Sequence, residues 1–211
     1  MKNVLIIGAH YDDAELGAGG TAAFLVSKGC NVYKLTLTNN VTNFLQRKIK
    51  VEYDSSLESS KKACDVLGVK EITEFKPIEC NSLVYDTKIM QQIEDIIYKY
   101  SIDTVFIHYN HDINQDHNAA SRLSLTAARH CDNVLFYQSN GYVLDVQFTP
   151  TIFFDISKFV DKKKLALEQY GNEHNRFNRL FEINLKRNEL WGYGNKCEYA
   201  EGFMPVKWLE K

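Results

Sequence analysis

The chain has 211 residues, of which 45% are hydrophobic and 25% are charged, and its formal net charge at pH 7 is -2. This composition is typical of a globular protein, and the length suits one core, so we expect a single domain over residues 1–211. The small net charge gives no electrostatic reason to expect nucleic acid or an anionic membrane as a partner.

The start of the chain and its cysteines favour a cytoplasmic protein. The first predicted strand begins within three residues of Met1, without an apolar h-region or a cleavage site. No apolar run approaches the roughly 20 residues needed to span a bilayer. The five cysteines are odd in number and show no C-x-x-C spacing, which argues against a disulfide framework and a cysteine-based zinc site.

The predicted elements alternate between strands and helices. Branched apolar residues at 4–7 predict a buried strand, and after a glycine-rich stretch a helical pattern begins at Thr21. Further strands are predicted at 31–38, 71–75, 104–109, 134–137 and 151–156, and helices at 52–67, 86–100, 118–129, 157–170 (capped by Ser157) and 176–190. We expect a polar loop at 39–50, and at 191–211 a folded loop over one end of the sheet.

This alternation, with short connections, predicts an α/β fold. It indicates a doubly wound, mostly parallel sheet with helices on both faces, in three layers α/β/α. Ligands bind such sheets at the carboxyl ends of the strands. Polar side chains gather after two predicted strands: His10, Asp12 and Asp13 after the first, and His108, His111, Asp112, Asn114, Asp116 and His117 after the fourth.

The two clusters could meet in space, because these strands can be neighbours in a doubly wound sheet. His10 and Asp13 lie on one turn and can point at one centre, and His117 completes a set of two imidazoles and one carboxylate. Three protein ligands with a fourth position open are typical of a catalytic zinc site. Such an ion lowers the pKa of bound water and polarises a carbonyl oxygen, which points to metal-assisted hydrolysis of an amide or ester.

Two neighbouring carboxylates have candidate roles, and each has a structural alternative. Asp12 faces differently from Asp13 and can take a proton from the water. Asp116 can hold a histidine in its tautomer. In the alternative, the Asp12–Asp13 pair caps the helix that follows, and the histidines are ordinary polar residues. We favour a site because the cluster recurs after a second strand. A nucleotide-binding loop fits poorly, since the glycines do not follow G-x-G-x-x-G and the carboxylates would repel a pyrophosphate.

Several segments resemble one family. Residues 9–17, A-H-Y-D-D-A-E-L-G, resemble the A-H-P-D-D-E-x-x-G segment of the PIG-L/LmbE-like family of zinc-dependent N-acetylglucosaminyl deacetylases. Residues 114–117, N-Q-D-H, resemble its H-x-D-H segment. The helix from Glu58 that ends in L-G-V at 67–69 and the Y-A-E-G-F sequence at 199–203 are also similar to segments of that family.

The resemblance implies a Rossmann-like fold and an N-deacetylase. Zinc, or iron(II) as the alternative, would be held by His10, Asp13 and His117, with Asp12 as general base for the metal-bound water. The substrate would be a small N-acetylamino-sugar conjugate: a free sugar, a nucleotide sugar or a glycoside. The carrier of the amino sugar and self-association of the chain are left open.

The chain departs from the family pattern near the site. Tyr11 replaces a proline and places a phenol where it could contact substrate, and Ala14 replaces a glutamate, with Glu15 one position later. Asn114 stands where the family has the histidine assigned to oxyanion stabilisation or acid catalysis. An amide can donate a hydrogen bond but supplies no proton at neutral pH.

These departures leave alternatives open. His111 or His108 could substitute for the missing histidine, or Asp12 could act as both base and acid. One further alternative is a related hydrolase of a non-sugar amide or ester. Another is a sugar-binding protein that has lost turnover.

Overall fold

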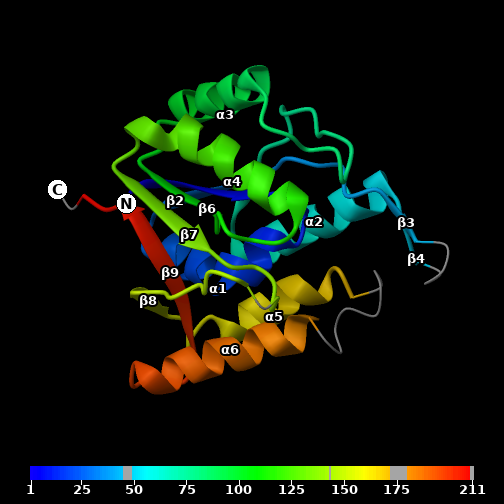
Figure 1. The fold of residues 1–211 in the computed structure, drawn as a ribbon. Coiled ribbons are helices and arrows are strands. Elements are labelled where there is room, and N and C mark those ends of the chain that lie inside the picture. The colour runs from blue at the N-terminus through cyan, green and yellow to red at the C-terminus, as the bar shows by residue number, and fades with distance from the viewer. Residues whose placement is uncertain (45–48, 143, 172–179, 210–211) are drawn as a thin grey trace.

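A seven-stranded sheet forms the centre of the molecule (Figure 1). The structure is a computed structural model that describes residues 1–44, 49–142, 144–171 and 180–209. The strands lie side by side in the order β5–β2–β1–β6–β7–β9–β8. Their bounds are β1 (Asn3–Gly8), β2 (Asn31–Thr36), β5 (Lys70–Glu71), β6 (Thr104–His108), β7 (Asn133–Tyr137), β8 (Ile152–Asp155) and β9 (Ala200–Lys207).

The sheet is mostly parallel, as the sequence predicts. Strands β5, β2, β1, β6 and β7 run parallel to their neighbours, whereas β9 is antiparallel to both β7 and β8. The first and fourth predicted strands, β1 and β6, are direct neighbours, with Val4 opposite Thr104. The segments that follow them therefore leave the same edge of the sheet.

Helices cover both faces of the sheet, which confirms the α/β class (Figure 1). Each face has its own apolar core, one formed with α3 and α4 and the other with α1, α2 and α5. The helices are α1 (Asp13–Ser27), α2 (Tyr53–Leu67), α3 (Thr87–Lys99), α4 (Gln115–Ala127), α5 (Val160–Glu168) and α6 (Leu180–Gly194), with a 3-10 turn at Ala128–His130. None of the helices in the described part of the chain is long and apolar enough to cross a membrane.

Helix α1 begins at Asp13 rather than at Thr21, and it is broken at Ala18, whose φ of -146° is not helical. A buried ion pair spans this break. Lys163 Nζ donates to the carbonyl oxygen of Leu16 (2.8 Å) and lies 2.6 Å from Glu201 Oε1. The Glu201 carboxylate accepts from the backbone N–H groups of Gly20 (3.0 Å) and Thr21 (2.7 Å). The ion pair thus satisfies backbone groups on both sides of the break.

Several other segments differ from the sequence-based predictions. The predicted loop at 39–50 contains two strands of a hairpin, β3 (Thr42–Phe44) and β4 (Ile49–Val51). The predicted loop at 191–211 contains β9, which is an internal strand of the main sheet. Helix α4 starts at Gln115, before the predicted start, and the strand predicted at 71–75 is only the short β5.

The prediction for Ser157 is wrong. The N-cap of α5 is Phe159, and the Ser157 hydroxyl instead donates to Asp155 Oδ1 (2.6 Å) and accepts from the N–H of Tyr199 (3.1 Å). It therefore ties the end of β8 to the segment that leads into β9. The first residues of the helix predicted at 176–190 lie outside the described residues, and the remainder belongs to α6.

Candidate metal centre

Two strand-to-helix turns meet at the carboxyl edge of the sheet. The turn from β1 to α1 carries His10, Asp12 and Asp13, and the segment from β6 to α4 carries Asp116 and His117. Since β1 and β6 are adjacent and parallel, the predicted convergence of the two polar clusters is found in the structure.

His10, Asp13 and His117, which we call the candidate metal centre, lie in mutual contact. His10 Nδ1 is 3.1 Å from His117 Nε2 and 3.3 Å from Asp13 Oδ2, and His117 Nε2 is 3.3 Å from Asp13 Oδ1. Asp13 is fixed by the backbone N–H of His10, which donates to Asp13 Oδ2 at 2.7 Å. A tetrahedral ion with ligands at about 2.0–2.2 Å separates neighbouring ligand atoms by roughly 3.3–3.6 Å. The observed separations are close to this geometry.

The outer nitrogens of both histidines face carboxylates. His10 Nε2 is 3.2 Å from Asp116 Oδ2, and His117 Nδ1 is 3.0 Å from Asp112 Oδ2. A carboxylate in this position selects the tautomer that carries its proton on the outer nitrogen. When both rings are neutral, the inner nitrogens of His10 and His117 therefore both present lone pairs, at a separation of 3.1 Å. Two lone pairs at this distance are held together by a proton or by a metal ion, and with the Asp13 carboxylate beside both nitrogens the donor set fits a metal ion.

The electrostatics of the cluster also favour a bound cation. Burial opposes the charged form of His10, but hydrogen bonds with Asp116 and Asp13 outweigh it and hold the pKa of this imidazole well above its usual value. Burial likewise lowers the pKa of His117, but the charge of Asp13 and the hydrogen bond with Asp112 raise it to about 9. The carboxylates therefore stabilise positive charge at these two rings.

Asp12 occupies the N-cap position of α1, but its side chain makes no capping hydrogen bond. It is almost fully buried, and its backbone carbonyl accepts from the N–H of Leu16 (3.0 Å). The structural alternative, in which the Asp12 carboxylate caps the helix, is therefore wrong. The role of Asp12 as general base stays a prediction.

Asn114 and His111, both candidate catalytic residues in the sequence, have other surroundings. The Asn114 side chain caps α4, since its Oδ1 accepts from the N–H groups of Asp116 (2.9 Å) and His117 (3.2 Å). His111 is exposed, and its ring lies beside Tyr109, with ring centroids 5.5 Å apart. The structure places Asp116 against His10, in the tautomer-fixing position that the sequence suggested.

His108 lies under the candidate metal centre. Its ring stacks on His117, and its Nε2 is 3.1 Å from Asp13 Oδ2, 3.0 Å from the N–H of Ala9 and 3.1 Å from the Tyr137 hydroxyl. Burial and the charge of His117 lower the pKa of His108. This buried imidazole packs against two members of the centre.

Tyr11 and Glu15, which lie where the chain departs from the family pattern, both face the core. Tyr11 is buried and lies beside Tyr53, with ring centroids 6.5 Å apart, so its phenol is in the core rather than at a substrate-contacting position. Glu15 forms a buried ion pair with Lys34 (2.7 Å), and the Lys34 ammonium also donates to the backbone carbonyl of Tyr11. Glu15 thus stabilises the turn through Lys34.

Sequence reasoning missed Asn140. Its Nδ2 donates to Asp112 Oδ2 (3.0 Å), the carboxylate that holds His117. Arg187 fixes the segment that carries Asn140 by donating to the backbone carbonyls of Asn140 (2.7 Å) and Gln138 (2.6 Å). The sequence feature that could have indicated Asn140 is the polar segment directly after the fifth predicted strand, at the same edge of the sheet as the two clusters.

Comparisons with known proteins place the chain in a family. The profile of the PIG-L family, described as GlcNAc-PI de-N-acetylase, matches residues 5–128. The chain is 27% identical over 173 residues to a protein of Escherichia coli (strain K12) named uncharacterized deacetylase YaiS, covering 78% of this chain and 88% of that protein.

Solved structures share the fold over nearly the whole chain. GalB, the 4-carboxy-2-hydroxymuconate hydratase of Pseudomonas putida KT2440, is similar with a TM-score of 0.82 and 21% identity, over 100% of this chain and 98% of GalB. The N,N'-diacetylchitobiose deacetylase of Pyrococcus horikoshii has a TM-score of 0.78 and 17% identity, over 97% of this chain and 84% of that one. At these identities the structures establish the fold, which evidently occurs with more than one chemistry.

Proposed function

The chain belongs to the PIG-L family of de-N-acetylases, enzymes that hydrolyse amide bonds, and we propose that it removes the N-acetyl group from a small N-acetylamino-sugar conjugate with the help of a divalent metal ion. The ion, zinc as first choice and iron(II) as the alternative, would be held by His10, Asp13 and His117. The observation that carries this proposal is the 3.1 Å approach of His10 Nδ1 and His117 Nε2, with both outer nitrogens committed to carboxylates.

A bound divalent ion would make water more acidic and polarise the acetamide carbonyl oxygen. The protein must then supply a base close to the ligands. Apart from the proposed ligand Asp13, Asp12 is the carboxylate closest to His10 in the sequence, because it lies between His10 and Asp13 in the same turn. We assign the role of base to Asp12. The water oxygen forms a bond to the carbonyl carbon, and Asp12 takes the released proton.

The same carboxyl group can complete the reaction. Cleavage of the carbon–nitrogen bond yields acetate and an amine, and the leaving nitrogen needs a proton. Asn114 cannot supply it, because its side chain is an amide that caps α4. His111 is exposed and its ring lies tilted beside Tyr109, and His108 is buried against Asp13. Asp12 therefore returns the proton it took.

An open hollow beside the centre offers room for the carrier of the amino sugar. It has a volume of about 430 Å³, and Asp112, which holds His117, is among its lining residues. The guanidinium of Arg122 lies 5.6 Å from the ring centroid of Tyr85 at this hollow. Gln115 and Asn118 add amide groups to the wall. An aromatic face with several hydrogen-bonding groups suits a sugar ring.

The test is acetate release by zinc-reconstituted protein across a panel of N-acetyl sugars, their disaccharides and nucleotide-linked forms, with non-sugar acetamides and acetyl esters included. We expect release from at least one amino-sugar conjugate. The variant Asp12→Asn should keep its metal and lose about 10²–10⁴-fold in turnover, the usual contribution of a general base.

Other outcomes would change the assignment. Unchanged turnover in Asp12→Asn would remove the general base. Release only from non-sugar acetamides or esters would replace the sugar substrate. Binding of an amino sugar to metal-loaded protein without any release would favour a binding protein on the same fold.

A further inference from the structure

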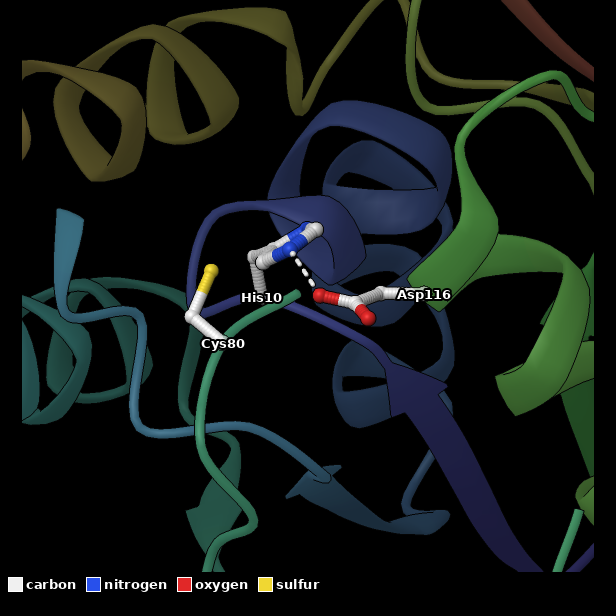
Figure 2. A group of neighbouring side chains, drawn as sticks. All are labelled: His10, Cys80 and Asp116. Carbon is white, nitrogen blue, oxygen red and sulfur yellow. Dashed lines mark hydrogen bonds and ion pairs between the residues drawn. The ribbon is translucent and has the colours of Figure 1, made fainter. Parts of the chain in front are cut away.

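The far side of the His10 imidazole faces a second set of metal-binding side chains. Figure 2 shows Cys80 and Asp116 on either side of His10. Neither residue belongs to the candidate metal centre, and the three side chains form a separate group of possible metal ligands. One ligand atom from each of these three residues lies within 4.8 Å of the other two, and His10 Nε2 is 3.2 Å from Asp116 Oδ2. Cys80 comes from the segment between β5 and α3, whose function the deacetylase proposal does not explain.

Hydrogen bonds hold Cys80 and Asp116 in this arrangement. The N–H of Cys80 donates to Asn39 Oδ1 (3.0 Å), which fixes the backbone that carries the thiol. The next residue, Asn81, donates its N–H to Asp116 Oδ2 (2.7 Å), and Leu83 donates to the other oxygen of that carboxylate (3.3 Å). The segment that carries Cys80 and the helix that carries Asp116 are therefore fixed relative to each other.

We propose that His10, Cys80 and Asp116 form a second cation site, selective for a soft divalent ion such as Zn²⁺ or Cd²⁺. The site offers one sulfur, one nitrogen and one oxygen, which are the three ligand types that zinc accepts. The sulfur distinguishes it from the candidate metal centre, whose ligands are nitrogen and oxygen, and a thiolate favours softer ions over Mg²⁺ or Mn²⁺. Three protein ligands leave a further position for water.

The two sites share one residue but use different atoms of it. The candidate metal centre uses His10 Nδ1, whereas the second site uses His10 Nε2. Binding at the second site removes the proton from Nε2 and from the Cys80 thiol, so protons are released to solvent. Occupying both sites leaves the His10 ring without any proton, and we therefore expect the second ion to bind more weakly than the first.

A Cd²⁺ titration of chelator-stripped protein tests the site through the ultraviolet charge-transfer band of cadmium bound to thiolate. Wild-type protein should bind two equivalents, and one of them should produce the band. Cys80→Ser should abolish the band and weaken the second equivalent by more than the roughly 10–100-fold that loss of an outer-shell partner costs. The partly exposed thiols of Cys30 and Cys197 provide matched controls, and Cys30→Ser and Cys197→Ser should keep the band.

The variant His117→Ala separates the second site from the first. It removes a ligand of the candidate metal centre but none of the second site, so the cadmium–thiolate band should persist. A band that is lost in His117→Ala, or that survives in both Cys80→Ser and Cys80→Ala, would overturn the proposal. Because the titration measures metal binding, its result is independent of whether acetate release is found.

Discussion

Asn114 precedes the two residues of α4 that face the cluster, and its side chain holds their backbone. Its Oδ1 accepts from the N–H groups of Asp116 and His117 at the first turn of the helix. We expect Asn114→Ala to lower the free energy of unfolding by about 0.5–2 kcal/mol, the usual cost of a lost N-cap. Asn114→Asp should keep most of the wild-type stability, because aspartate is also a good N-cap residue. Urea unfolding measures both. Loss of acetate release in Asn114→Ala at unchanged stability would instead assign the amide to substrate.

Asp112 contacts the outer nitrogen of the His117 ring and not the expected metal position. It should therefore affect metal affinity only by holding the His117 imidazole. Its Oδ2 is 3.0 Å from His117 Nδ1, and burial of the carboxylate is outweighed by this hydrogen bond and the charge of His117, which lower the pKa of Asp112. We expect Asp112→Asn to weaken zinc binding by about 10–100-fold in a chelator competition. Asp95→Asn, at an exposed position of α3, is the control and should leave the affinity unchanged.

At the scale of elements, the broken helix α1 depends on the buried pair Lys163–Glu201. Both side chains are fully buried and lie 2.6 Å apart. Removing one charge leaves the other without its partner in the core, so Glu201→Gln should lower the free energy of unfolding by about 3–5 kcal/mol. The neighbouring Lys164 pairs with the exposed Asp161 (3.3 Å), and Lys164→Met should change stability by less than about 1 kcal/mol. Equal effects in the two variants would refute the role of the buried pair.

The glycines of α1 provide a second test of the same element. A Cβ on Gly17 would lie 2.1 Å from Tyr137 Cδ2, whereas a Cβ on Gly19 would meet its nearest neighbour, Lys163 Cγ, only at 3.5 Å. Tyr137 also contacts His108, so displacement of its ring would reach the cluster. We expect Gly17→Ala to cost about 1–3 kcal/mol by overpacking, and Gly19→Ala to be neutral or stabilising. Thermal unfolding of the two variants compares them directly.

The elements that sequence patterns predicted well are those whose burial is uniform. Strands β1, β6 and β7 are apolar and buried on both faces, and each was predicted to within a residue or two at its ends. The start of α1 was missed because its glycines lower local helix propensity, while Lys163 and Glu201, distant in sequence, stabilise the break. Strand β9 was missed because two successive helices, α5 and α6, break the strand–helix alternation before it, and it joins the sheet antiparallel to β7.

At the scale of the whole molecule, the sheet order explains why two distant clusters form one centre. The convergence of His10, Asp13 and His117 required only that β1 and β6 be neighbours, and a doubly wound sheet makes this arrangement common. The contributions of Cys80 and Asn140 could not be predicted in this way. They depend on the path of the segment after β5 and on the support of Arg187, which local patterns do not encode.

Metal binding should raise the stability of the whole molecule, with a pH dependence set by the histidines. Zinc that binds only the native state adds about 2.7 kcal/mol at a concentration of 100 times Kd. In stripped protein, the raised pKa of His117, about 9 against an ordinary 6.5, adds stability that is complete below about pH 6.5 and is lost as the pH rises through about 9. Zinc must displace this proton, so the stability that zinc binding adds increases as the pH rises.

We therefore expect the difference in Tm between zinc-loaded and stripped protein to grow as the pH is raised from about 6 to about 8.5. Differential scanning calorimetry at several pH values measures this difference. In His117→Ala the part of the zinc-induced gain in Tm that comes from the candidate metal centre should be lost, together with the pH dependence that this imidazole sets, because the ligand and the titrating group are the same imidazole. A gain that shrinks with rising pH in the wild type would mean that zinc binds elsewhere, at groups that are already free of protons at low pH.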